Sequence, residues 1–442
     1  MCRAPGVRHC SGHPSCGVPR SDRRDAQNGT PAPGGTPAGP PYSPEEVVRA
    51  LDRLRAGSGS HSPSVAQIEQ AIPGLVQVDA CFLSNPYATD VVMGRLREIP
   101  ADRLERMVAH YPSQTPAVAA ALAPHLRVPA QNLHLGNGAC EVIQSLLASR
   151  PGTVLLSVPT FSAYYEFAQG PVVTHQLQPD DDFRLDLDAL EAMVYRHAPQ
   201  TVVIINPNNP DGGPVATSSL VRFIERVHAS VGQIIVDESF SHFAGEEAPE
   251  TVAPLVAQLP RLVVVNSLSK SHGIAGLRLG YAVMAARRVR ELRESALWNL
   301  NTFAEWFCGL LGEPAFQADY EQARRRYVRD TRAFFGELGR APGLRAHPTA
   351  ANFALVQVDR PAGQVAGSLL AGHGIYVRDC GDKRGLDGDR FLRIASRTAQ
   401  ENQRILHAVH AVLGAGPFEA GAARLNFAPA PADSLTEGLR TA

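Results

Sequence analysis

The sequence predicts an α/β protein with a layered large domain and a smaller α+β domain after it. Two observations carry this prediction. Between residues 113 and 290, short Val/Ile-rich runs alternate with amphipathic stretches of helical period. Between residues 343 and 413, shorter apolar runs mix with two helical patterns. Continuous apolar strands separated by helices indicate parallel strands that are covered on both faces.

The expected elements follow the chain in order. A helix is expected over Pro44–Ala56, because Ser43 can cap it and a proline fits its first position. Strands of the large domain are expected at 153–157, 172–177, 201–205, 233–236, 262–265 and 277–283. Helices are expected at 187–195, 218–229 and 317–339, and strands of the smaller domain at 353–358, 374–378 and 391–394.

The predicted organisation has five parts. Residues 1–41 hold eight Pro and seven Gly, which predicts a disordered tail because such a segment buries too little surface to order itself. Residues 42–110 are expected to form an N-terminal arm with a helix. The large domain is expected over 111–300, and a linking helix with the small C-terminal domain over 301–415. Residues 416–442 are expected to be a second loose tail.

The composition argues against several classes of protein. The 442 residues carry 42 basic and 43 acidic side chains, and this balance is not typical of a nucleic-acid binder. No apolar run is long enough to span a membrane and no signal stretch opens the chain, so a cytoplasmic location is expected. The seven cysteines are widely spaced, and Cys10, His13 and Cys16 lack the paired spacing of a zinc site. No disulfide framework and no metal are therefore expected.

Lysine is rare in this chain, where Lys270 and Lys383 are the two lysines among the 42 basic residues. Lys270 lies in VVVNSLSKSHGIAGLRLGY, an apolar run followed by hydroxyl residues and a Gly-rich stretch. Beside low-polarity strands the neutral amine of a lysine is favoured, and a neutral amine can form a Schiff base with an aldehyde. Ser267, Ser269 and Arg278 offer donors to a phosphate. A surface lysine in a loop is the alternative at this point.

Three further segments lie at expected strand ends. Residues 135–141 (LGNGACE) precede a helical run, where backbone amides can face an anion, although the third glycine of a dinucleotide fingerprint is missing. Residues 206–212 (NPNNPDG) force an extended loop, and Asp237 after the next strand can pair with a cationic ring nitrogen. A tight turn, a plain loop and a capping acid are the respective alternatives. The three segments and the Lys270 segment lie at strand ends of one domain, and their order along the chain indicates a shared site.

With these motifs and PTFSAY at 159–164, the chain resembles a fold-type I pyridoxal 5'-phosphate (PLP) enzyme. It is most similar to the histidinol-phosphate aminotransferase branch of the class I/II aminotransferases, over about residues 75–413. The resemblance implies a large domain with a mostly parallel seven-stranded sheet between helices, a smaller α+β C-terminal domain, PLP as cofactor, and a homodimer with active sites at the interface.

The resemblance also implies roles for individual residues. Lys270 would form the aldimine with PLP, and Asp237 would pair with the pyridinium nitrogen. The ring would be held by Phe161 and Asn209, and the phosphate by Gly138, Ala139, Cys140, Ser267, Ser269, Arg278 and Tyr111 of the neighbouring subunit. The substrate carboxylate would be bound by Arg393, in a pocket that also holds Arg378, Asn352 and Tyr87.

The activity expected from the resemblance is that of an aminotransferase, which interconverts an amino acid bearing a second polar or anionic group and its 2-oxoacid. The alternative is a decarboxylase, eliminase or cyclase acting on a modified amino acid, because all these reactions begin with the same lysine-bound cofactor.

Three positions depart from the branch: Phe240 replaces a tyrosine, Cys140 replaces an acid, and Arg397 replaces a small residue. Arg397 is expected to be solvated at a helix start. The three departures argue against histidinol phosphate as the substrate. A PLP-sensing transcription factor and a nucleotide-dependent oxidoreductase have no supporting motif.

Overall fold

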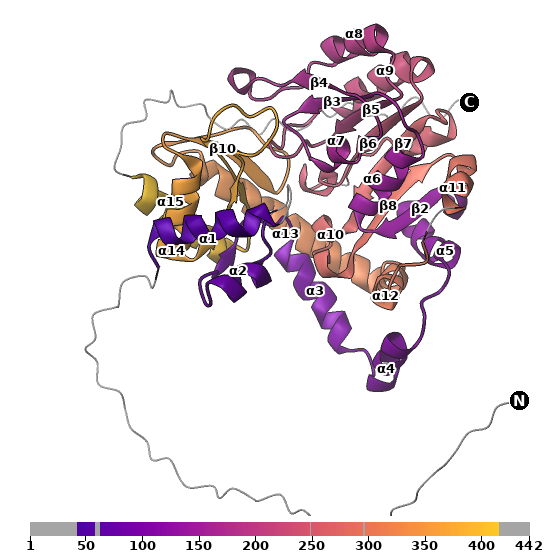
Figure 1. Ribbon diagram of the computed structural model, residues 1–442. Coiled ribbons are helices and arrows are strands. Elements are labelled where there is room, and N and C mark those ends of the chain that lie inside the picture. The colour runs from indigo at the N-terminus through magenta and orange to yellow at the C-terminus, as the bar shows by residue number, and fades with distance from the viewer. Residues whose placement is uncertain (1–41, 58–61, 248, 295–296, 415–442) are drawn as a thin grey trace, which may run out of the picture. The chain divides into compact units, whose positions relative to one another are not determined.

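A seven-stranded sheet forms the frame of the larger part of the chain (Figure 1). The computed structural model describes residues 42–414 except 58–61, 248 and 295–296. The strands follow the order β2 (Leu133–Asn137), β8 (Leu279–Met284), β7 (Leu262–Ser267), β6 (Gln233–Asp237), β5 (Thr201–Ile205), β3 (Val154–Val158) and β4 (Val172–Gln176). Strands β3 to β7 pair in parallel, whereas β8 is antiparallel to both of its neighbours.

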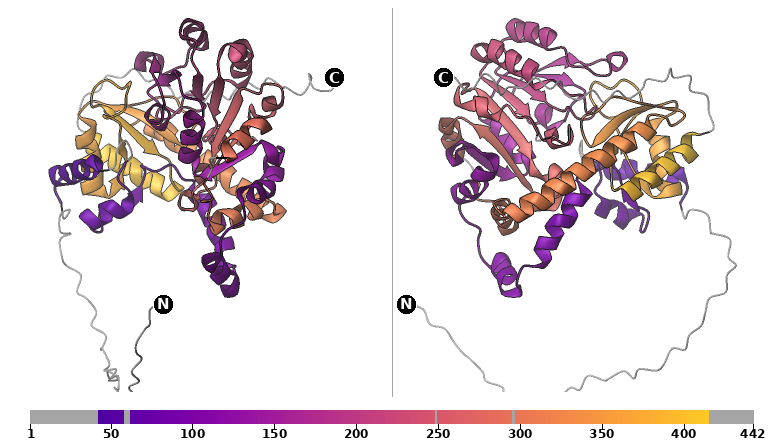
Figure 2. Two further views of the ribbon diagram at one scale, coloured as in Figure 1. Left: turned by 45° about the vertical axis from the view of Figure 1, so that its right-hand side comes forward. Right: turned by 180° about the vertical axis from the view of Figure 1, so that it is seen from behind.

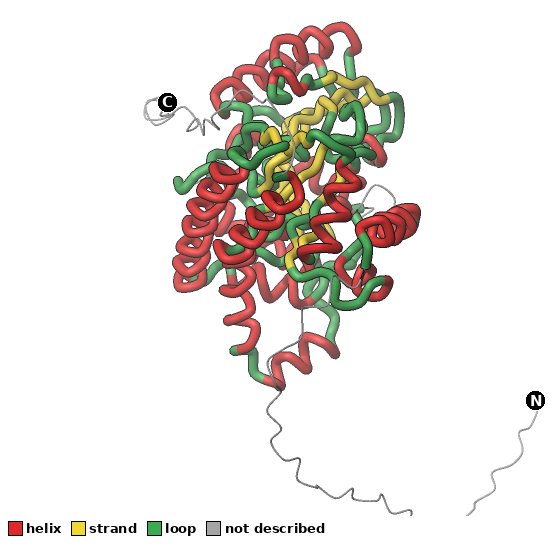
Figure 3. The backbone as a smooth tube through the Cα atoms, turned by 90° about the vertical axis from the view of Figure 1, so that its left-hand side faces the viewer, coloured by secondary structure: helices red, strands yellow, loops and turns green. Residues whose placement is uncertain are grey.

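Alternation along the strands gives the sheet two apolar faces. In β5, Val202 and Ile204 face one core cluster, while Val203 and Ile205 face another, because successive side chains point to opposite faces. The first face packs against α5 (Thr115–Leu126), α8 (Leu187–His197), α9 (Thr217–Val227) and α12 (Thr302–Leu310). The second packs against α6 (Ala139–Ala148), α7 (Ala163–Glu166) and α11 (Ala286–Arg293). Figure 3 shows the strands between these helices.

Strand β8 is antiparallel because its connection to β7 is short. Eleven residues, 268–278, separate the two strands and contain only the one-turn helix α10 (Leu268–Ser271) and a 3-10 turn. A parallel crossover needs a dozen or more residues and usually a full helix. The short return therefore leaves Lys270 in α10, directly at the carboxyl end of β7.

A second, smaller set of strands lies beside α14 (Ala362–His373) and α15 (Ala399–Leu413). Its antiparallel sheet has the order β12 (Arg378–Asp379), β13 (Phe391–Ala395), β10 (Phe353–Val358) and β9 (Leu344–Ala346). A parallel pair is formed by β1 (Val78–Asp79) and β11 (Ile375–Tyr376). Helix α1 (Pro44–Ala56) packs against α14, so the start of the described chain belongs to this part (Figure 1).

The remaining helices connect these parts. The long helix α13 (Pro314–Leu338) contacts both α3 (Pro86–Arg97) and α15, and Figure 2 shows it running from beside the large sheet to the small one. The other helices are α2 (Val65–Ala71) and α4 (Ala101–Ala109), with 3-10 turns at Ala130–Asn132, Pro179–Asp181, His228–Ser230, Ser241–Phe243, Ala253–Ala257 and Ala275–Leu277. None of the described helices is both long and apolar enough to cross a membrane, and the cytoplasmic location stays a prediction.

The architecture confirms the predicted fold class. The expected helix at Pro44–Ala56 is present, and Ser43 caps it in a reciprocal pair with Glu46. The strand over Leu133–Asn137 was not predicted, because its glycine and asparagine suggest a turn. The expected strand at 374–378 is divided into β11 and β12. The tails 1–41 and 416–442 lie outside the described residues, and the domain boundaries stay predictions.

One buried arginine fixes α13 to the loop that follows β6. The side chain of Arg324 is 1% exposed, and its guanidinium donates to the backbone carbonyls of His242 (3.0 Å), Gly245 (2.6 Å), Glu246 (2.6 Å) and Glu247 (2.9 Å). It also forms two bonds of 2.8 Å to the carboxylate of Glu321. Five acceptors therefore depend on one cation.

We expect Arg324→Met to lower the free energy of unfolding by about 3 kcal/mol, because it leaves buried carbonyl acceptors unpaired. Urea unfolding followed by circular dichroism measures the change. The control is Arg325→Met, which removes a 53% exposed arginine from the same Glu321 and is expected to cost at most about 1 kcal/mol. Equal effects of the two substitutions would contradict this account.

Candidate active site

A cavity of ≈ 340 Å³ lies where β5, β6 and β7 end. Loops after parallel strands converge at one edge of a sheet, so side chains from distant segments meet there. The wall is formed by Ser62, Phe82, Leu83, Ala139, Cys140, Phe161, Ser162, Ile205, Asn209, Asp237, Ser239, Phe240, Ser267, Ser269, Lys270, Ala275, Arg278, Arg378, Lys383 and Arg393. Most of the predicted cofactor residues are among them.

Lys270 is positioned by the start of α3. Its carbonyl accepts a hydrogen bond of 3.0 Å from the backbone N–H of Asn85. Asn85 is fully buried, caps α3 through its side-chain oxygen, and donates to the carbonyl of Ser271 (3.3 Å). Burial, and then the positive charge of Arg393, lowers the pKa of Lys270 to about 8. The amine is thereby brought close to its nucleophilic, neutral form at physiological pH.

Asp237 ends β6 and lies in the same cavity. Its carboxylate accepts 2.8 Å from the hydroxyl of Tyr164 and 2.9 Å from the backbone N–H of Ser239. Burial raises the pKa of Asp237, and the hydrogen bonds from Ser239 and Tyr164 oppose that rise. A cation placed against this buried carboxylate would further favour its ionised form.

The start of α6 and the segment after β7 form a cradle suited to a small anion. Gly138 precedes α6 with φ of 88°, and a Cβ there would lie 2.6 Å from Nη2 of Arg278. The Oγ atom of Ser269 is buried and has no hydrogen-bond partner among the described residues. An unpaired buried hydroxyl, the N–H groups of a helix start and a guanidinium are the groups that bind phosphate oxygens. The donors present therefore fit the phosphate of PLP.

The small sheet supplies the opposite part of the wall. Arg393 donates 2.8 Å to Oδ1 of Asn209 and 2.8 Å to the carbonyl of Cys81, while its buried Nε has no partner among the described residues. Because the bond uses the oxygen of Asn209, the Nδ2 donors of that amide remain for a ligand. Arg378 forms two bonds of 2.7 Å with Asp382 and one of 3.1 Å with Ser62.

Four predicted site residues are not part of the cavity wall: Gly138, which belongs to the cradle described above, and three residues that lie elsewhere. Tyr87 donates 2.6 Å to Asp330 instead. Asn352 is fully buried and donates to the carbonyl of Leu83 (3.1 Å). Tyr111 is 85% exposed, as a residue directed at a neighbouring subunit would be. The substrate and cofactor contacts of these three residues stay predictions.

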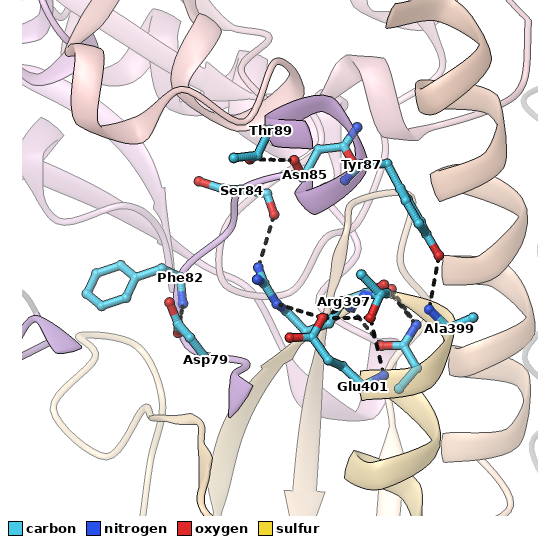
Figure 4. A network of polar contacts seen from close by, with 12 residues as sticks. Asp79, Phe82, Ser84, Asn85, Tyr87, Thr89, Arg397, Ala399 and Glu401 are labelled. Carbon is cyan, nitrogen blue, oxygen red and sulfur yellow. Dashed lines mark hydrogen bonds and ion pairs between the residues drawn. The ribbon is translucent and has the colours of Figure 1, made fainter. Parts of the chain in front are cut away.

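The expectation that Arg397 is solvated is wrong. Its side chain is 16% exposed, donates 3.3 Å to the carbonyl of Ser84 and lies 3.8 Å from Glu401 (Figure 4). The segment before α3 covers the side chain of Arg397. The sequence shows only that Arg397 precedes the capping residue of a helix, which does not predict this cover. The charge of Arg397 also opposes the rise that burial imposes on the pKa of Asp79.

Sequence reasoning missed several residues that line the cavity or, like Tyr164, support a residue that lines it. Tyr164 had a quoted motif but no role, and Lys383 had only the signal of being one of two lysines. Ser62 and Phe82 carry no motif, because they reach the site from the arm preceding the large sheet. No group of three or more His, Cys, Asp or Glu among the described residues could hold a metal, while Cys10, His13 and Cys16 lie outside them.

Comparison with known proteins assigns the family. The profile of "Aminotransferase class I and II" matches residues 82–409. The chain belongs to this family. It is 37% identical to the L-serine phosphate decarboxylase of Campylobacter jejuni over 377 residues, covering 83% of this chain and 96% of the relative. A solved decarboxylase from Sulfurospirillum multivorans is 36% identical with a TM-score of 0.79, covering 84% of this chain and 98% of that one.

The predicted branch is also confirmed. The histidinol-phosphate aminotransferase of a Thermoanaerobacter species is 28% identical over 298 residues, covering 66% of this chain and 81% of the relative. The family and its relatives show that this is a PLP-dependent enzyme with the fold-type I architecture. PLP is its cofactor, in agreement with the cradle and with the positions of Lys270 and Asp237.

The expected aminotransferase activity is wrong. Relatives with more than a third of their residues identical, over most of both chains, are decarboxylases, which supports the alternative stated from the sequence. The motifs that suggested transamination are the ones expected to hold the cofactor, and decarboxylases use the same cofactor. They carry no information on which bond at Cα is aligned for cleavage.

The low pKa of Lys270 predicts how PLP attaches to the apoprotein. Only the neutral amine reacts, so with a pKa of about 8 roughly one-tenth is reactive at pH 7 and nearly all above about pH 9. We expect the attachment rate, followed by visible absorption, to rise with pH and level off near pH 9. Nα-acetyl-lysine with PLP is the control, and its rate should still rise beyond pH 9. A rate that rises through pH 10 in the protein would contradict the shift.

Proposed function

We propose that the protein decarboxylates a phosphorylated α-amino acid, with L-serine phosphate as the substrate. The charge of the cavity carries this proposal: its wall has five basic side chains, Lys270, Arg278, Arg378, Lys383 and Arg393, and a single carboxylate, Asp237. After Lys270 and Arg278 are assigned to the cofactor, three cations remain for the substrate. A substrate with both a carboxylate and a phosphate matches this excess, and similarity to L-serine phosphate decarboxylases supports it.

The chain's own side chains divide the work of the reaction. Bound PLP supplies the electron sink that accepts the pair of electrons left when the bond at Cα breaks. Asp237, held by Tyr164 and Ser239, keeps negative charge against the ring nitrogen. Arg393 and Arg378 orient the substrate through its anionic groups. This orientation selects the bond from Cα to the carboxylate as the one that breaks.

Lys270 is the group suited to complete the reaction. The bond from Cα to the carboxylate breaks, carbon dioxide leaves, and one proton must be added at Cα. Lys270 lies in the cavity, and with a pKa of about 8 it is mostly protonated at pH 7 yet readily gives up its proton. The partly buried Cys140 thiol is a poor competitor because desolvation raises its pKa.

The proposal is tested by product analysis. Purified holoenzyme with L-serine phosphate should release equal amounts of carbon dioxide and O-phosphoethanolamine, and no 2-oxoacid, as measured by mass spectrometry. We expect kcat/KM for L-serine to be lower by at least about 100-fold, because the cationic wall is left without its anion. Formation of a 2-oxoacid in place of carbon dioxide would refute the proposal.

We further propose that the protein is a homodimer whose sites lie at the interface. Among the described residues, six large hydrophobic side chains are exposed, and five of them lie on or near α4: Leu104, Val108, Tyr111, Leu297 and Trp298. Helix α4 has no buried residue, and Figure 1 shows it away from the sheet. Exposed apolar patches of this kind mark interaction sites. Tyr111, which is expected to bind the cofactor phosphate of the neighbouring subunit, belongs to this patch and stacks on Trp298 with 5.3 Å between the ring centroids.

Val108→Asp should therefore weaken the dimer by at least about 100-fold in dissociation constant, because it buries an unpaired charge. Light scattering after size exclusion measures the mass, and decarboxylation should fall with the dimer fraction. Tyr195→Ser is the control, since Tyr195 is 55% exposed but lies on α8, outside the patch. A wild-type protein that is monomeric yet fully active would refute the dimer.

A further inference from the structure

The loop between β12 and β13 brings the second lysine of the chain to the cavity. Two successive turns shape it: the N–H of Lys383 donates 3.0 Å to the carbonyl of Cys380, and the N–H of Leu386 donates 3.1 Å to the carbonyl of Lys383. The loop thus folds back over the wall that already carries Arg378 and Arg393. Lys383 lines the cavity with them, although no catalytic motif includes it.

The large sheet holds this loop in place. The side chain of Gln176 donates 2.8 Å to the carbonyl of Gly385. Gly385 has φ of 87°, and a Cβ there would lie 2.8 Å from Cβ of Val158, so the backbone is in close contact with the end of β3. Leu386 packs in a cluster with Leu177, Phe183, Leu355, Cys380 and Phe391. Lys383 is therefore a fixed part of the wall, in a position where a ligand can meet it.

The charges around Lys383 leave it available to an anion. The nearest acid, Asp382, is engaged in two bonds of 2.7 Å with Arg378. Lys383 forms no ion pair and no side-chain hydrogen bond with the described residues. Burial, and then the charges of Arg378 and Arg393, lower its pKa to about 8. Three cations with one carboxylate form a site with excess positive charge.

Of the two anionic groups on the substrate, the phosphate is the better partner for Lys383. The carboxylate leaves as neutral carbon dioxide, so cations that hold it stabilise the ground state more than the transition state. The phosphate keeps its charge throughout the reaction. A lysine ammonium is a compact point charge that binds phosphate without a fixed fork geometry, and it complements the planar guanidinium of Arg378.

We infer that Lys383 binds the phosphate ester of the amino-acid substrate, beside Arg378, and thereby sets the preference for phosphorylated substrates. This inference rests on the proposed decarboxylation of L-serine phosphate. It assigns Lys383 to substrate binding and leaves the covalent chemistry to Lys270.

The test compares Lys383→Gln with Arg384→Gln in the holoenzyme. Arg384 is the next residue, but its guanidinium lies 5.9 Å over the ring of Tyr165 and is absent from the cavity wall. For Lys383→Gln we expect KM for L-serine phosphate to rise about 10- to 100-fold with kcat changed less than about threefold, which corresponds to one lost charge-assisted hydrogen bond. Lys383→Arg should restore most of the affinity, and Arg384→Gln should match the wild type.

A second measurement excludes a merely structural effect. L-serine, which lacks the phosphate, is titrated into each holoenzyme and followed by the visible absorption of the bound cofactor. Its apparent Kd should be the same in the wild type and in Lys383→Gln, whereas a distorted site would bind both ligands more weakly. A proportional loss for both ligands, or a loss in kcat at unchanged KM, would overturn the inference.

The failures of the two proposals are separable. If the wild type releases no carbon dioxide from L-serine phosphate, the proposed function fails, and the inference fails with it. If the wild type is active and Lys383→Gln has an unchanged KM, the function stands and the assignment of Lys383 is wrong.

Discussion

The guanidinium of Arg393 joins three segments that are distant in the sequence. It extends from β13, donates to Asn209 in the loop after β5 and to the carbonyl of Cys81 in the arm before α3, and lies 5.4 Å over the ring of Phe353. Charge-assisted hydrogen bonds in a buried site are short and directional. They therefore fix the small sheet against the strand ends that carry Lys270 and Asp237. The distance from Lys270 and Asp237 to the cations of the small sheet depends on these contacts of Arg393.

The two walls of the cavity have separate tasks. The wall from the large sheet holds groups that any PLP enzyme of this fold needs: an amine, an acid and a phosphate cradle. The wall from the small sheet holds the cations that we propose to bind the substrate. Reaction type follows from how the substrate lies between them, because the bond that breaks is the one that this orientation selects. Membership of an aminotransferase family is thus compatible with decarboxylation.

This division explains what the sequence could predict. Strands such as β5 and β6 are continuous Val/Ile runs, and Asp237 and Lys270, at or just past the ends of such strands, are found from local motifs. The opposite wall is assembled from separate segments with no shared pattern. Lys383 has its place because Gly385 fits against Val158, a contact between residues more than two hundred positions apart. Arg397 was misjudged for the same reason, since its surroundings come from the arm.

The register of the small sheet places Arg378 directly opposite Arg393 on the paired strands β12 and β13. Like charges facing each other across two strands weaken the pairing, and Asp382 offsets only part of this repulsion. An anion bound between the two guanidinium groups would reduce this repulsion. Its binding would therefore raise the free energy of unfolding by more than its contact area alone predicts. We therefore expect a bound anionic ligand to lower the fraction of opened molecules, and with it the rate at which a protease cleaves the chain.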